Sequence, residues 1–361
     1  MKNNEFLPAQ AVPHAALNTT LAPSQRRLPY RSILHKMVSG DLRIAALRRF
    51  AVAITVLNVV GHAILGFEQS WAQLCFAALT AWGIEAALEL VEAAVQRRPT
   101  PLRGGLGQAI DYLLPAHITG LAIVMLLYAN DRFAPIFFAI AIGLVSKRLL
   151  RVLVGRSRRH VLNPSNTGIA VTLFLLPSVG VAAPYEFTHY LHGAWDIALP
   201  ALIVVLGSLL TGLFTKRGPL ILAWLAAFAL QALVRAALFG TPALAGIAPM
   251  TSMVFFLFTF YMLPDPGTTP ISTRGQVAFG AAVAAVYGLL MVLHIVFMIF
   301  LALLIVCSIR GAYLALRGLL GATAAAHFPL PASTAANATA APSITSHEAQ
   351  PPLAPLERST P

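Results

Sequence analysis

The sequence predicts an all-α integral membrane protein, a bundle of about ten transmembrane helices with both termini cytoplasmic. Three observations predict this class. The chain of 361 residues is 58% hydrophobic, only 11% charged, and has a mean hydropathy of +0.75, whereas a soluble domain is about a quarter charged. Apolar segments that suit a hydrocarbon core roughly 30 Å thick recur along the chain. Lys and Arg cluster in alternate connections between these segments.

Hydropathy, together with the positions of Pro, Gly and charged residues, predicts ten spans. They are Phe50 to Phe67, Trp71 to Val95, Ile110 to Tyr128, Phe133 to Val145, Gly168 to Ala183, Ile197 to Phe214, Pro219 to Phe239, Ala248 to Leu263, Val277 to Leu293 and Phe297 to Leu316. The chain then divides into a cytoplasmic tail at 1–46, a membrane domain at 47–318 and a cytoplasmic tail at 319–361. The second tail is rich in Ala, Pro, Ser and Thr, and this composition predicts that it is disordered.

The net charge of +12 acts here as a topology signal. With a cytoplasmic amino end, every Lys and Arg except Arg132 and Arg235 falls on the cytoplasmic side or at that edge of a span. We therefore expect a multi-pass protein of the cell inner (plasma) membrane. The basic residues are spread over separate loops without interleaved aromatic residues, which argues against a nucleic-acid partner.

Two irregular segments carry the strongest motifs, and both are expected on the cytoplasmic side. The first, Ser146 to Asn166, reads SKRLLRVLVGRSRRHVLNPSN. Pro164 suits the first turn of a helix that Asn163 or Ser165 can cap. The positive helix end and basic residues such as Arg159 would suit a phosphate-bearing ligand. The alternative is a basic loop that only fixes topology and contacts anionic lipid.

The second segment, Leu263 to Gln276, reads LPDPGTTPISTRGQ. Asp265 can hydrogen-bond a tight turn that Pro266 and Gly267 define, and several hydroxyl groups follow it. Taken alone, this segment is also consistent with a purely structural turn.

Together the two segments resemble the flavin-carrying NqrB/RnfD-type membrane subunits of sodium-translocating NADH:quinone oxidoreductase and the Rnf complex. The likeness covers roughly spans two to ten. The segments HITGLAIVMLLYANDR and HIVFMIFLALLIVCSIRG are similar to a stand-alone branch, some members of which are described as enediyne biosynthesis membrane proteins.

The resemblance implies a ten-span bundle and flavin mononucleotide, which typical members carry on a threonine of a Ser-Gly-Ala-Thr segment after the fifth span. The stretch here reads SVGVAAPYEFTHYLHGAWD and lacks that segment. A noncovalent flavin, FMN or riboflavin, is the remaining expectation. The residues expected to hold it are Arg159, Asn163, Ser165, Asn166, Asp265, Thr268 and Thr269.

The implied function is to relay electrons toward a quinone or another subunit, with coupled ion transport left open. The sequence contains no iron–sulfur cysteine set and no nucleotide-binding GxGxxG after a strand. Electrons would therefore come from a partner subunit, a soluble flavoprotein or an iron–sulfur donor. The catalytic residues of such a reaction are not predicted.

Polar residues inside the predicted spans suggest a different function. Glu85, Glu89 and Glu92 share one helical face, and Glu92 lies near basic residues that can pair with it. Glu85 and Glu89, with His117 on the next span, form a candidate ion or proton path or a plain internal ion pair. His117 is expected to pair with one of the two carboxylates, or else to make an ordinary interhelical hydrogen bond.

Two further functions thus stand beside electron transfer. One is a cofactor-free transporter of a small solute or ion, and the other is an accessory membrane protein of a secondary-metabolite pathway. No metal site is predicted, because Cys75 and Cys307 lie in separate apolar runs. His189 and His192, with Glu186 beside them, would still need at least one more ligand.

Overall fold

The computed structural model describes residues 29–154, 157–183, 187–209, 216–295 and 297–327, although the side chains of 29–43, 298 and 321–327 are outside this description. The described chain is mainly helical. Its first part contains α1 (Pro29–Val60), η1 (Gly61–Leu65), α2 (Trp71–Val95), η2 (Pro101–Arg103), α3 (Leu106–Leu126), α4 (Ala134–Leu149) and α5 (Pro164–Leu175). Its second part contains α6 (Trp195–Leu209), α7 (Gly218–Phe239), α8 (Ala243–Ile247), η4 (Ala248–Thr251), α9 (Met253–Leu257), η5 (Phe258–Met262), α10 (Thr273–Val292) and α11 (Met298–His327).

Six helices are long and apolar enough to cross a membrane, and a seventh crossing results if the bent pair Ala243–Thr251 and Met253–Met262 counts as one span. The six are Ile44–Leu65, Trp71–Val95, Leu106–Leu126, Gly218–Phe239, Thr273–Val292 and Ile299–Leu320. The fold class of a helical, multi-pass membrane protein is therefore confirmed. The 16-residue α4 and 12-residue α5 reach about 24 Å and 18 Å, less than a hydrocarbon core.

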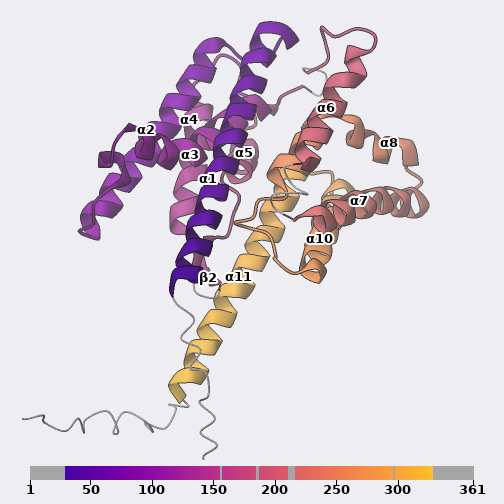
Figure 1. Ribbon diagram of the computed structural model, residues 1–361. Coiled ribbons are helices and arrows are strands. Elements are labelled where there is room, and N and C mark those ends of the chain that lie inside the picture. Colours follow the sequence, from indigo (N-terminus) through magenta and orange to yellow (C-terminus); the bar gives the residue numbers. More distant parts are fainter. Residues whose placement is uncertain (1–28, 155–156, 184–186, 210–215, 296, 328–361) are drawn as a thin grey trace, which may run out of the picture.

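The helices form two groups that α11 connects. Figure 1 shows α1 to α5 on one side and α6, α7, α8 and α10 on the other. The last helix packs against α5 in the first group and against α10 in the second. This arrangement brings the amino end of α5 close to the chain that precedes α10.

Two small antiparallel pairs complete the fold. β1 (Leu127–Tyr128) pairs with β4 (Gly180–Val181), and β2 (Arg151–Val154) pairs with β3 (Ser157–His160) as a hairpin between α4 and α5. The hairpin register places Val152 opposite Arg159. The basic segment expected to be a loop is therefore partly an ordered ribbon, packed against α11.

Close helix packing depends on small residues, as is usual where lipid gives helices little hydrophobic drive to associate. A Cβ atom added at Gly168 of α5 would lie 2.2 Å from the carbonyl oxygen of Ala139 on α4. The two short helices thus contact each other backbone to backbone, and α5 is held in a fixed position.

An aromatic cluster joins α7 to the α9–η5 segment. Trp224 is fully buried, stacks on Phe255 at 5.6 Å between ring centroids, and meets Phe228 edge-on. Its indole N–H donates to the Thr259 hydroxyl at 2.9 Å, so the polar end of this side chain is satisfied inside the apolar cluster.

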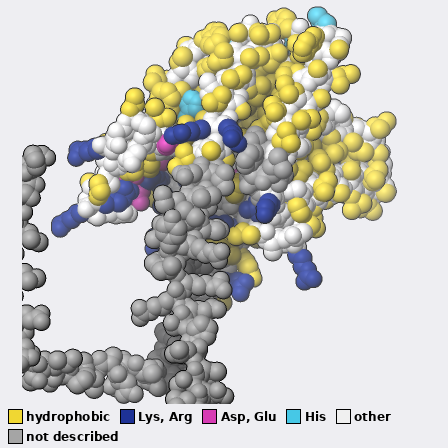
Figure 2. Space-filling view, in the orientation of Figure 1, with side chains coloured by type: hydrophobic (Ala, Val, Ile, Leu, Met, Phe, Trp, Pro, Cys, Tyr) yellow, Lys and Arg dark blue, Asp and Glu magenta, His cyan; other side chains and the backbone are white. Residues whose placement is uncertain are grey.

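Charge is distributed unevenly over the surface. In Figure 2 the Lys and Arg side chains gather toward one end of the molecule, while hydrophobic side chains dominate the remainder of the visible face. A hydrophobic surface of this extent suits lipid contact.

The helix α1 begins at Pro29, inside the predicted first tail, and α11 continues to His327, past the predicted boundary at 318. Most of the second tail lies outside the described residues.

Candidate functional site

The two sequence motifs meet at the amino end of α5. Asn163 caps α5 through its side-chain oxygen, which accepts from the backbone N–H of Asn166 at 3.0 Å and from the Ser165 hydroxyl at 2.9 Å. Its amide nitrogen donates to the carbonyl of Met262 at 3.1 Å, a residue 99 positions later at the end of η5. One buried asparagine therefore caps one motif and holds the other beside it.

Asn166 makes a third connection. Its amide nitrogen donates to the carbonyl of Phe300 on α11 at 3.0 Å. Its side-chain oxygen is buried and has no hydrogen-bond partner. A buried acceptor without a donor is costly, so an N–H or O–H group placed beside this atom would stabilise the site.

Asp265 organises the turn after η5, as the sequence predicted. One carboxylate oxygen accepts from the Gly267 N–H at 2.9 Å, and the other lies 3.1 Å from Nε2 of His160. The Asp265 carbonyl accepts from the hydroxyl of Thr269 at 2.7 Å and from that of Thr268 at 3.3 Å. Burial alone would raise the pKa of Asp265, but the hydrogen bonds from His160 and Gly267 outweigh it and hold the pKa below its ordinary value.

Three arginines surround this turn. Arg310 donates to the Thr268 carbonyl at 2.8 Å, and Arg217 donates to the Pro270 carbonyl. Arg159 is close enough for its charge to act on both. Burial and the charge of Arg159 lower the pKa of Arg217, against the attraction of Asp265, although a guanidinium remains protonated at neutral pH.

We call this assembly the Asp265 cluster, and it is defined by Asp265, His160, Arg159, Arg217 and Arg310 together with the turn 265–270. Its three arginines face one carboxylate, so it carries an excess of positive charge. Arg217 is only 5% exposed, and its Nε atom is buried without an acceptor. These features suit a bound anion.

The expected cofactor residues are thus brought together, but they do different work. Asn163, Thr268 and Thr269 donate side-chain hydrogen bonds to backbone carbonyls, so their main role is to shape the turn and the helix end. Sequence reasoning missed Arg217 and Arg310 as members. Their signal was a charged residue beside or within an apolar run, as in the LLIVCSIRG stretch that contains Arg310.

A second polar assembly lies where α2, α3 and α4 meet. Glu89 is 1% exposed and forms a bidentate pair with Arg98 at 2.5 and 3.0 Å. It also accepts from the Tyr112 hydroxyl at 2.7 Å. Glu85 is 2.9 Å from Arg148 and 3.5 Å from Lys147.

Glu92 pairs with Arg148 and, at 3.9 Å, with Arg151. It therefore contacts the end of α4, and its sequence neighbours Arg97 and Arg98 are not its ion-pair partners. We call this assembly the carboxylate network; its members are Glu85, Glu89, Glu92, Arg98, Tyr112, Lys147, Arg148 and Arg151.

The pairing favours an internal ion-pair network for Glu89, since both of its oxygens are occupied. Glu85 differs, because its second oxygen is buried and has no partner. The network contains three carboxylates and four cationic side chains, so a mobile cation would have to compete with these side chains for the carboxylates.

Of the two alternatives for His117, the structure contains the interhelical hydrogen bond and not the contact with Glu85 or Glu89. The Nε2 atom of His117 is 2.8 Å from the Thr55 hydroxyl on α1, and its ring stacks on Trp82 at 5.5 Å. Thr55 donates its own proton to the Ala51 carbonyl at 2.7 Å. His117 must therefore donate from Nε2, which makes an ordinary interhelical hydrogen bond.

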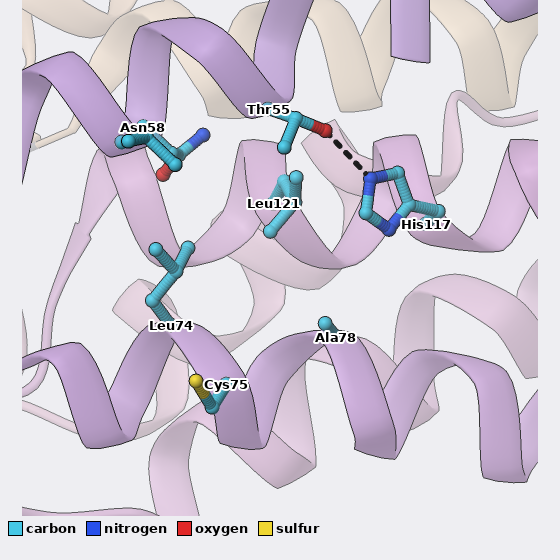
Figure 3. A pocket seen from close by; sticks show the side chains of 8 residues that line it. Thr55, Asn58, Leu74, Cys75, Ala78, His117 and Leu121 are labelled. Carbon is cyan, nitrogen blue, oxygen red and sulfur yellow. Dashed lines mark hydrogen bonds between the residues drawn. The ribbon is translucent and has the colours of Figure 1, made fainter. Parts of the chain in front are cut away.

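His117 borders a cavity of about 130 Å³ between α1, α2 and α3 (Figure 3). The cavity is lined by Thr55, Asn58, Val59, Leu74, Cys75, Ala78, His117 and Leu121. No carboxylate lines it, so it does not continue the carboxylate network into a path for cations. The two cysteines are separate, Cys307 packed in the core and Cys75 exposed on α2.

Comparison of the chain with models of known protein families and with functionally characterised proteins finds no match in either case.

Proposed function

We propose that this protein is a membrane subunit of an electron-transport system of the NqrB/RnfD type, with a noncovalent flavin held at the Asp265 cluster. The observation that carries the proposal is the convergence of two motifs about a hundred residues apart on one electropositive turn. The basic side faces the cytoplasm in this proposal, and both termini lie there. The shorter helices α4, α5 and α6 then complete a bundle of ten crossings in the cell inner membrane.

The chemistry of the site fits the phosphate of FMN. Arg159, Arg217 and Arg310 supply guanidinium groups, which match a phosphate in shape and charge. The unpartnered Nε of Arg217 lacks an acceptor that a phosphate oxygen provides, and the unpartnered oxygen of Asn166 lacks a donor that a flavin imide provides. A bound flavin would supply reversible electron transfer, and the chain would bind, orient and shield it.

Electrons would enter from a partner subunit, a soluble flavoprotein or an iron–sulfur donor and leave toward a quinone. The carboxylate network is next to this site, because the charge of Lys147 acts on both Glu85 and Asp265. That proximity would allow the two assemblies to influence each other electrostatically.

The test is a visible absorption spectrum of the protein purified in mild detergent, followed by titration with FMN and with riboflavin. FMN should bind at least about tenfold more tightly than riboflavin, because each charge-assisted hydrogen bond to its phosphate contributes about 1.5–3 kcal/mol. Arg217→Gln should remove most of that difference. Arg274→Gln, which changes an exposed arginine at the start of α10, should leave it intact. A protein that binds neither flavin would refute the proposal.

A further inference from the structure

Arg235 lies far from the basic end of the molecule. It sits on α7 seventeen residues after Gly218, about 25 Å along the helix from the Asp265 cluster. The residue is only 8% exposed. A buried guanidinium inside an apolar bundle is costly unless an anion or several acceptors compensate it.

The protein supplies little of that compensation. Arg235 donates from Nε to the side-chain oxygen of Gln231 at 2.9 Å, while its Nη2 atom is buried without an acceptor. The amide nitrogen of Gln231 is also buried without an acceptor. Among the residues that the structure describes, no carboxylate lies within 4.0 Å of Arg235.

Neighbouring helices enclose this pair of donors. A Cβ atom at Gly246 of α8 would lie 3.2 Å from Arg235 Nη2, and one at Gly288 of α10 would lie 3.0 Å from the Gln231 side chain. Tyr287, which is 6% exposed, is near enough for the charge of Arg235 to act on it. Three elements thus enclose the donors, and α8 begins the bent pair with its 67° break.

We propose that Arg235, together with Gln231, binds an oxyanion, either a carboxylate or a phosphate, at the end of α7 away from the Asp265 cluster. A guanidinium fork presents paired N–H groups to such a ligand, and the adjacent amide adds a donor one helical turn away. The ligand would restore the missing acceptors and neutralise the buried charge. The same chemistry is offered by a soluble anion and by a lipid phosphate group. This site is independent of flavin binding at the Asp265 cluster.

Binding to the purified full-length protein should be measured with acetate, with inorganic phosphate and with phosphatidylglycerol in mixed micelles. Arg235→Gln should weaken binding at least about tenfold, in line with the loss of one charge-assisted hydrogen bond or more. Arg235→Lys, which retains the charge and is milder for folding, should give a smaller loss because the fork is gone. The component of binding lost in these variants is assigned to this site, which separates it from anions held by the Asp265 cluster.

Arg132→Gln is the matched control, because Arg132 is exposed and already donates to the Ser178 hydroxyl at 2.9 Å. It should change the affinities by less than about twofold. Loss of acetate or phosphate binding in Arg235→Gln would identify a soluble oxyanion as the ligand, and loss of phosphatidylglycerol binding alone would identify a lipid. The proposal fails if no probe binds the wild-type protein, or if both Arg235 variants bind every probe as the wild type does.

Discussion

Arg148 is the residue whose removal should most disturb the carboxylate network. Its side chain is 12% exposed and contacts Glu85 at 2.9 Å, Glu89 at 3.5 Å and also Glu92. Arg148→Met would retain the size of the side chain and remove its charge. Breaking a buried pair by removing one partner typically costs about 3–5 kcal/mol, because the other charge stays buried. We expect the variant to lose about that much free energy of unfolding.

Arg48→Gln provides the scale against which to judge this loss. Arg48 makes a bidentate pair with Asp111 at 2.7 and 2.8 Å, but its side chain is 60% exposed. Exposed pairs contribute about 0–1 kcal/mol. Arg48→Gln therefore gives the loss expected for a single, well-formed ion pair at the surface, and Arg148→Met should exceed it because Arg148 is buried and contacts three carboxylates.

Unfolding can be followed in an SDS titration with a fluorogenic maleimide. In a Cys75→Ser background the remaining thiol, Cys307, is 1% exposed and should react only on unfolding. The deficit of Arg148→Met should shrink as pH falls, since protonation relieves carboxylates left without a partner. Adding Glu85→Gln should recover part of the loss. A loss no larger than that of Arg48→Gln, or one independent of pH, would refute the reasoning.

Three further predictions concern packing and the Asp265 cluster. Gly168→Val should lower the free energy of unfolding by about 1–3 kcal/mol or more, because its Cβ would lie 2.2 Å from a backbone oxygen of α4. In the same SDS titration the control Gly83→Ala should be neutral or stabilising, because a Cβ atom there meets nothing within 4 Å. Gly267→Ala would place a methyl group 2.1 Å from the His160 ring, so it should weaken FMN binding by displacing that ring. The lowered pKa of Asp265 means that its contribution is complete above about pH 4, the ordinary range of an aspartate, and is lost as the pH falls through its folded value; Asp265→Asn should flatten the acid limb of a plot of stability against pH.

Several features of the site could be predicted from short stretches of the sequence. The cap at Asn163 and the turn at Asp265 follow from a residue type at a fixed position next to a proline or glycine, and the structure contains both. The shared face of Glu85 and Glu89 follows from helical periodicity. Each is a property of a few consecutive residues, so it survives whatever the remainder of the chain does.

The sequence by itself determined that the chain is a helical, multi-pass membrane protein and where most of its helices lie, because apolar length and composition set the cost of leaving water for lipid. Only the tertiary structure decided which side chain each polar residue meets. Arg148 reaches Glu85 from 63 positions away, and His117 meets Thr55 and not a carboxylate. Hydropathy and periodicity show which face of a helix is polar, but the neighbour that covers that face depends on helix packing between distant segments.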